Sequence, residues 1–181
     1  MLGMVFTEFI EMVESRFSPE LADSVIAAAA LPHGGAYTAV GYYPHAEMLA
    51  LLAALSERSG IAVADLVCAF GEHLLGRFVA AYPQMFSARA NLFDFLASID
   101  GEIHREVRKL YPAAQLPRFT VLARSAQQLM LAYESPRGME ALALGLMRGA
   151  ARHYREAVQI SQAPAEFEGR AIVRFQIDRQ P

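Results

Sequence analysis

The spacing of the apolar residues changes along this chain, and the change limits the folds that it can adopt. Up to about residue 112, apolar residues recur every three or four positions, as at Val5, Phe9 and Val13, which is the period of a helix face. Beyond Pro117 the period becomes two, most clearly from Arg170 to Asp178. Helices first and strands later predict an α+β fold, mainly helical in the N-terminal two thirds, with a C-terminal antiparallel sheet.

Residues that start and stop helices divide the chain further. Ser18 can cap a helix that begins at Pro19, the segment His33 to Pro44 has the composition of a loop, and Pro112 stops the helical part. Further helices are expected at Glu47 to Arg58, Ile61 to Ala81, about Asn91 to Tyr111 and Met139 to Ala157, and short strands at Phe119 to Ala123 and Leu129 to Tyr133. A predicted buried stripe follows the helix from Asn91, at Phe95, Ile99, Ile103, Val107 and Leu110.

Length and composition exclude several classes of protein. The 181 residues contain no linker-like stretch, so we expect a single domain over residues 1–181. Cys68 is the only cysteine, which argues against a disulfide or a thiolate zinc site and predicts a small buried residue. A net charge of -3 without a basic run argues against nucleic acid as a partner. The apolar runs are shorter than the ~20 residues that span a bilayer, and the N-terminus lacks secretory features, so a cytoplasmic location is expected.

His104 is the first candidate for binding chemistry. It lies beside the apolar stripe of its helix, and none of the five histidines has a second ligand at metal-binding spacing. A lone histidine in this position is more often a hydrogen-bonded core residue than a ligand. Both interpretations stay open on this pattern alone.

Tyr133, Ser135 and Arg137 are the second candidate group. Alternate residues of an extended segment point the same way, so these three can present a phenol, a hydroxyl and a guanidinium together. Such donors suit carboxylates, and the guanidinium can bind one in a bidentate manner. The alternative is a turn with an arginine on the surface.

The order of these motifs is more specific than either motif alone. Ile103-His104, Leu110-Tyr111-Pro112 and Leu116-Pro117 precede Tyr-x-Ser-x-Arg, and Gly145-Leu146 and Gly149-Ala150 follow it. With Met1-x-Gly3 and Ala69-Phe70-Gly71, this series resembles the H-NOX family, the haem nitric oxide/oxygen binding domains related to the sensor region of soluble guanylate cyclase.

The resemblance implies a haem b cofactor buried between the helical part and the sheet. It implies that His104 binds the iron, that Tyr133, Ser135 and Arg137 hold the propionates, and that Pro117 presses on the haem plane. The residues that match the distal gas pocket of the family are all apolar: Val5, Phe9, Leu74, Phe78 and Leu142.

The residue at position 142 bears on the choice of gas. Oxygen-binding members of the family have a tyrosine nine residues after the motif tyrosine, and this chain has Leu142 there. Bound oxygen gains from a hydrogen-bond donor, whereas nitric oxide binds ferrous iron tightly without one. The expected ligands are therefore nitric oxide and carbon monoxide, with an oxygen sensor as the alternative. Tyr82 and His73 lie near Leu74, but His73 is turned about 100° from it around the helix, which disfavours a second histidine on the iron.

The resemblance also implies how a signal leaves the domain. Nitric oxide would weaken or break the bond between His104 and iron, and the helix from Asn91 to Tyr111 would shift. The expected partner is a separate histidine kinase or cyclic-di-nucleotide enzyme. The sequence contains no recognisable nucleophile–base pair and no phosphate-binding loop, so an enzyme is not expected. The alternative from another class is a haem-free helical adaptor in which Arg137 lies on the surface.

Overall fold

Eight α-helices, one π-helical turn and four strands make up the part of the chain that the computed structural model describes, residues 1–32 and 34–180. The helical part holds α1 (Gly3–Arg16), α2 (Pro19–Ala28), α3 (His45–Ser59), α4 (Val63–Ala81), α5 (Pro83–Ser87), α6 (Leu92–Ser98), the π-helical turn η1 (Ile99–Ile103) and α7 (His104–Leu110). The C-terminal part holds β1 (Arg118–Arg124), β2 (Gln128–Glu134), α8 (Glu140–Tyr154), β3 (Val158–Phe167) and β4 (Arg170–Arg179). The predicted α+β class is confirmed.

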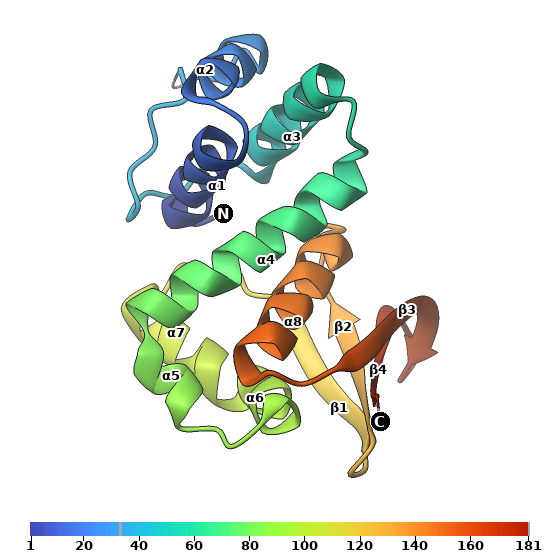
Figure 1. Ribbon diagram of the computed structural model, residues 1–181. Coiled ribbons are helices and arrows are strands. Elements are labelled where there is room, and N and C mark those ends of the chain that lie inside the picture. Colours follow the sequence, from blue (N-terminus) through green and yellow to red (C-terminus); the bar gives the residue numbers. More distant parts are fainter. Residues whose placement is uncertain (33, 181) are drawn as a thin grey trace.

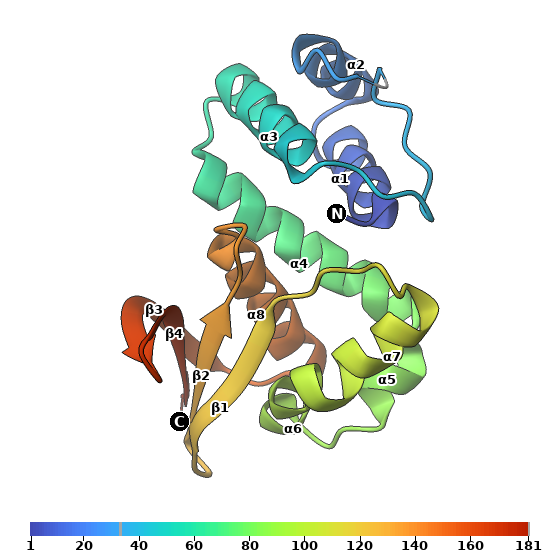
Figure 2. The same cartoon turned by 180° about the vertical axis from the view of Figure 1, so that it is seen from behind.

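The long helix α4 separates two groups of elements. Helices α1 to α3 lie on one side of it, and α5 to α8 and the sheet lie on the other (Figure 1). The sheet is antiparallel, with the order β1-β2-β4-β3. Seen from behind, the β1–β2 hairpin lies next to α6 and α7 (Figure 2). The helical run that holds His104 therefore lies beside β1, the strand that contains Phe119.

Two glycines allow α4 and α8 to cross closely. A Cβ atom at Gly145 would lie 2.0 Å from the carbonyl oxygen of Cys68, and one at Gly71 would lie 2.5 Å from that of Leu142. Any larger residue would push the two helices apart. The glycines named in the sequence motifs thus have a packing role.

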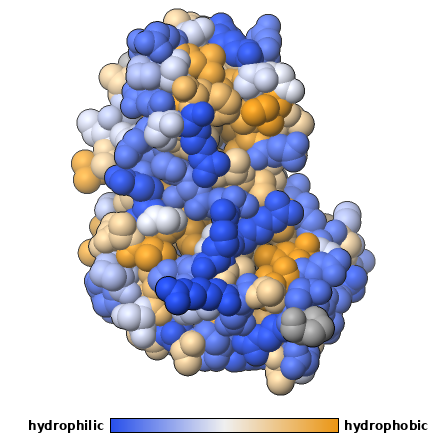
Figure 3. All heavy atoms as spheres, viewed as in Figure 1, coloured by the Kyte–Doolittle hydropathy of each residue, from blue (hydrophilic) through white to orange (hydrophobic). Residues whose placement is uncertain are grey.

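The apolar residues form two hydrophobic clusters, one on each side of α4. The first is built mainly from α1 to α4, and the second from α6, α8 and the sheet. Phe78 and Leu146 pack against both clusters. On the face shown in Figure 3 hydrophilic residues predominate, and apolar ones form separate small patches. No helix in the described part of the chain is both long enough and apolar enough to cross a membrane.

Most expected elements are found close to their predicted limits. Ser18 Oγ accepts a hydrogen bond from the Leu21 amide at 3.2 Å, which confirms the predicted cap. Cys68 is buried, as expected. The predicted loop is confirmed over residues 34–44, whereas His33 lies outside the described residues.

The helix predicted from about Asn91 to Tyr111 is present as one helical run from Leu92 to Leu110, but it is not α-helical throughout. The π-helical turn η1 interrupts it directly before His104. One extra residue in a turn rotates the following residues by about 100° around the axis. This explains why Leu110, predicted to lie in the buried stripe, is 59% exposed.

The sequence pattern also missed β3 and placed the end of α8 too late. Helix α8 ends at Tyr154 rather than Ala157, because Arg155 adopts a left-handed conformation with φ of 56°. Strand β3 lies at the edge of the sheet and contains Pro164. Its residues alternate between half-buried and exposed over most of the strand, but it contains a proline, which argues against a strand except at a sheet edge.

Candidate functional site

His104 is a buried imidazole at the start of α7. It is 9% exposed, and its Nδ1 lies 3.4 Å from Asp100 Oδ1, on the π-helical turn. Burial lowers the pKa of His104, and the Asp100 carboxylate opposes this shift only in part. The ring is therefore neutral near pH 7, which is the form that binds a metal ion.

An aromatic row connects His104 with Tyr133. The His104 ring centroid lies 6.0 Å from that of Phe119, which lies 5.2 Å from that of Tyr133. Phe119 and Tyr133 are register partners in β1 and β2. The structure thus brings together two predicted site residues from the helical part and the sheet. Phe119 itself was predicted only as part of a strand.

Tyr133 has a buried phenol with a hydrogen-bonding neighbour. The side chain is 5% exposed, and burial raises the pKa of its hydroxyl, against the smaller effects of a hydrogen bond with Ser135 and the charge of Arg137. The phenol is therefore protonated at neutral pH and can donate a hydrogen bond. Glu140, at the start of α8, is the acidic group that acts on it.

Ser135 and Arg137 lie in the turn after β2, not in the strand. Strand β2 ends at Glu134, and Ser135 Oγ accepts a hydrogen bond from the Arg137 amide at 3.3 Å. The guanidinium donates to Gln115, from Nη1 to the carbonyl oxygen at 2.7 Å and from Nη2 to Oε1 at 2.9 Å. The turn, rather than strand alternation, positions Arg137. No local sequence signal indicates its contact with Gln115, which depends on the tertiary fold.

Pro117 lies next to His104 through its backbone. Its carbonyl group takes part in a hydrogen bond with the imidazole, which slightly counteracts the lowering of the His104 pKa. The segment before β1 therefore runs along the histidine. The position agrees with a site shared by Pro117 and His104, and its ring remains a candidate for contact with a bound group.

The five residues predicted for a gas pocket meet around α4. Phe9 and Leu74 belong to the first hydrophobic cluster, and Val5, Phe78 and Leu142 are half-buried against it. They come from α1, α4 and α8. None of their side chains has a hydrogen-bond donor. The structure brings all five into one apolar region.

The two polar residues near this region make contacts elsewhere. His73 Nε2 lies 3.6 Å from Glu8 Oε2 on α1, in agreement with the expected sideways orientation. Burial raises the pKa of Tyr82, as does a hydrogen bond with Tyr111. Both polar side chains thus have partners outside the apolar group.

A cavity of about 250 Å³ borders the apolar group between α1 and α4. Phe78 is the one predicted pocket residue in its wall, and Met4, Ala80 and Ala81 supply further apolar surface. Glu8 and Arg77, which form an ion pair at 2.8 Å, also line it. Phe78 thus borders this cavity, which the sequence pattern did not indicate.

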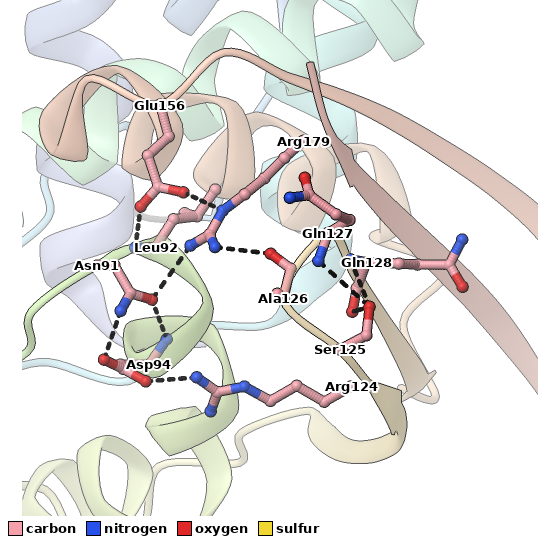
Figure 4. A network of polar contacts seen from close by, with 10 residues as sticks. All are labelled: Asn91, Leu92, Asp94, Arg124, Ser125, Ala126, Gln127, Gln128, Glu156 and Arg179. Atoms are coloured by element: carbon pink, nitrogen blue, oxygen red, sulfur yellow. Dashed lines mark hydrogen bonds and ion pairs between the residues drawn. The ribbon is translucent and has the colours of Figure 1, made fainter. Parts of the chain in front are cut away.

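A polar network fixes the beginning of the helical run that leads to His104 (Figure 4). Glu156 accepts hydrogen bonds from the Leu92 amide at 2.7 Å and from Arg179 Nε at 2.8 Å. Arg179 Nη1 also donates to the carbonyl oxygen of Ala126 at 2.8 Å. The start of α6, the end of α8, the β1–β2 turn and β4 are thereby held together. These contacts join distant parts of the chain, so spacing alone does not reveal them.

Comparison with known proteins supports one family. A family model described as haem-NO-binding matches residues 2–162. The structure of an unliganded Fe(II) H-NOX protein from K. algicida has 35% sequence identity and a TM-score of 0.92, with 100% of this chain and 97% of that chain covered. An H-NOX protein from S. oneidensis in the Fe(II)NO state has 25% identity and a TM-score of 0.90, with both chains covered completely.

A comparison with curated protein sequences found no match. The family match nevertheless extends over most of the chain, and the solved structures share its whole fold. The chain therefore belongs to the haem-NO-binding (H-NOX) family of haem-based gas-sensor domains.

Proposed function

We propose that this protein is a cytoplasmic nitric oxide sensor in which His104 binds the haem iron. The observation that carries the proposal is the row His104, Phe119 and Tyr133, which joins a buried neutral imidazole to a group of hydrogen-bond donors. A neutral imidazole is an iron ligand, and phenol, hydroxyl and guanidinium donors suit carboxylates. The side chains therefore fit an iron porphyrin with two propionates.

In this proposal Tyr133, Ser135 and Arg137 hold the propionates. Arg137 uses two of its donors on Gln115 and has others for a carboxylate. Pro117, whose carbonyl group lies beside His104, would contact the porphyrin. Ferrous haem supplies the position at which a diatomic gas binds.

The apolar group around α4 would determine which gas is retained. Val5, Phe9, Leu74, Phe78 and Leu142 offer no hydrogen bond to a bound diatomic molecule. Oxygen depends on such a donor for stable binding, whereas nitric oxide and carbon monoxide do not. We therefore infer that the protein discriminates against oxygen.

Release of His104 from the iron when nitric oxide binds is the proposed trigger. His104 begins α7 directly after the π-helical turn, and its movement acts on both segments. A separate histidine kinase or cyclic-di-nucleotide enzyme would read the shift, so the domain itself needs no catalytic residues. This is a two-state switch in which the ligand favours one state.

Absorption spectra of the purified protein test the proposal. The wild type should show a Soret band, which His104→Ala loses and added imidazole restores. Nitric oxide added to the ferrous protein should give the spectrum of five-coordinate haem, and air should leave no stable oxygen complex. A colourless protein after expression with ample haem would support the adaptor. A stable oxygen complex would support the oxygen sensor, and a retained His104 bond would contradict the trigger.

A further inference from the structure

The positive charge of Arg137 acts on His45, and neither residue forms an ion pair in the part of the chain that the structure describes. His45 is the first residue of α3, and burial lowers its pKa, as do the positive charges of Arg137 and the amino group of Met1. Its Nε2 is shielded from solvent and has no hydrogen-bond partner. The neutral His45 imidazole at the N-terminus of α3, which has a partial positive charge, is thus under the influence of two cationic groups, Arg137 and the Met1 amino group.

The contacts of Arg137 do not relieve this accumulation of positive charge. Its hydrogen bonds go to the neutral carbonyl and amide oxygens of Gln115. No ion pair among the described residues includes Arg137 or His45. Like charges disfavour each other, and a shielded polar nitrogen without a hydrogen-bond partner costs free energy. A carboxylate would remove both costs at once.

We propose that His45 is a further carboxylate-binding residue, which with Arg137 binds one carboxylate of the porphyrin. The inference rests on the proposed function, because the porphyrin supplies the carboxylate. His45 takes up a proton from solvent when the carboxylate binds, so the two opposite charges are paired. The residue adds to the group formed by Tyr133, Ser135 and Arg137.

This role links the two sides of α4. His45 belongs to the helical group of α1 to α3, whereas Arg137 follows β2 on the other side (Figure 1). One carboxylate held by both residues therefore connects α3 to the turn after β2. Loss of that connection changes how strongly the N-terminal helices are held to the rest of the molecule.

A variant and an esterified porphyrin together isolate the interaction. Wild type and His45→Gln are each loaded with iron protoporphyrin IX or with its dimethyl ester, which has no carboxylates, and release to an excess of apomyoglobin is timed. We expect the variant to lose the natural haem about tenfold faster, since a charge-assisted hydrogen bond is removed. With the ester, both proteins should release at the same rate.

The control is His153→Gln, which removes an exposed histidine on α8 and should leave both rates unchanged. Equal acceleration with both porphyrins would make His45 a structural residue, and no acceleration with haem would also overturn the inference. His45→Lys keeps a positive charge and should restore slow release. If wild type itself shows no Soret band that depends on His104, the proposed function fails instead.

The protonation of His45 gives a second readout. The charged groups that face it, Arg137 and the Met1 amino group, are both positive, so the protein without porphyrin disfavours its protonation. NMR titration of the diamagnetic carbon monoxide complex should give a higher pKa for His45 than the porphyrin-free protein. Release of haem should then be slower below that pKa than above it. An unchanged or lowered pKa in the complex would contradict the inference.

Discussion

His104 is held on two sides by groups that affect its strength as a ligand. Nδ1 faces Asp100 at 3.4 Å, and Phe119 packs near the ring. A carboxylate that accepts the Nδ1–H proton makes the other nitrogen more basic and fixes the ring. The π-helical turn brings Asp100 into this position, four residues before the histidine.

Asp100→Asn should weaken the bond between His104 and iron. The amide is a poorer acceptor than the carboxylate, so the iron–histidine stretching frequency measured by resonance Raman spectroscopy should fall. Haem affinity should decrease by about tenfold, which is the lower end of the range of effects seen when a group that supports a metal ligand is removed. Asp23→Asn, on the exposed face of α2, is the control. An unchanged stretching frequency in Asp100→Asn would show that the carboxylate has no influence on the ligand.

Leu142→Tyr should give the protein a stable complex with oxygen. The phenol adds a donor to an apolar group that has none, and bound oxygen gains from a hydrogen bond. The absorption spectrum of the reduced variant in air measures the effect. Leu142→Phe adds the ring without the hydroxyl and should remain unable to retain oxygen. A stable oxygen complex in Leu142→Phe as well would mean that ring size, and not the hydrogen-bond donor, matters.

Helices α4 and α8 depend on glycine at their crossing. The space at Gly145 is limited by the backbone of Cys68, which has no side-chain freedom to move aside. In contrast, Gly76 on α4 is exposed and has no atom within 4 Å of an added Cβ. The two glycines therefore test packing and helix propensity separately.

Gly145→Ala should lower the free energy of unfolding by about 3 kcal/mol, because the added methyl group forces the helices apart. Gly76→Ala should raise it by about 0.5 to 1 kcal/mol, since alanine favours a helix interior. Denaturant titrations of both variants measure these changes. An unchanged free energy of unfolding in Gly145→Ala would indicate that α4 and α8 separate at little cost in free energy.

The molecule as a whole consists of two hydrophobic clusters joined along α4. The proposed site draws on both sides, with the apolar gas pocket in the first cluster and Tyr133 in the second. Between α1 and α4, His73 is half-buried and packs against Glu8. The charge on this histidine therefore affects the stability of the helical group.

Stability should fall as the pH drops from about 7 to 5.5, and His73 contributes to this loss. Burial lowers the pKa of His73 in the folded protein, and the negative charge of Glu8 opposes this shift only in part. In the unfolded chain the histidine has its usual pKa of about 6.5. As the pH falls, the unfolded chain therefore binds the proton first, and the folded state loses stability. His73→Gln should show a shallower decrease in denaturant midpoint over this range. His153→Gln should follow the wild type. Equal slopes for wild type and His73→Gln would contradict this contribution.

Sequence alone determined the features that depend on local chemistry. Helical spacing and the change to alternation identified the fold class, and Ser18 and Pro19 marked the start of α2 because caps act within a few residues. The motif residues and their resemblance to a known family indicated the cofactor and the candidate ligands. Such features are readable because each depends on neighbours in the chain.

Tertiary structure decided the features that depend on residues far apart in the chain. The π-helical turn changed the face on which Leu110 lies, and the edge position of β3 explains why that strand can contain Pro164. The contacts of Arg137 with Gln115, and its proximity to His45, arise only when α3, β1 and β2 are packed together. Burial and charge at such contacts are properties of the folded molecule, so no residue spacing contains them.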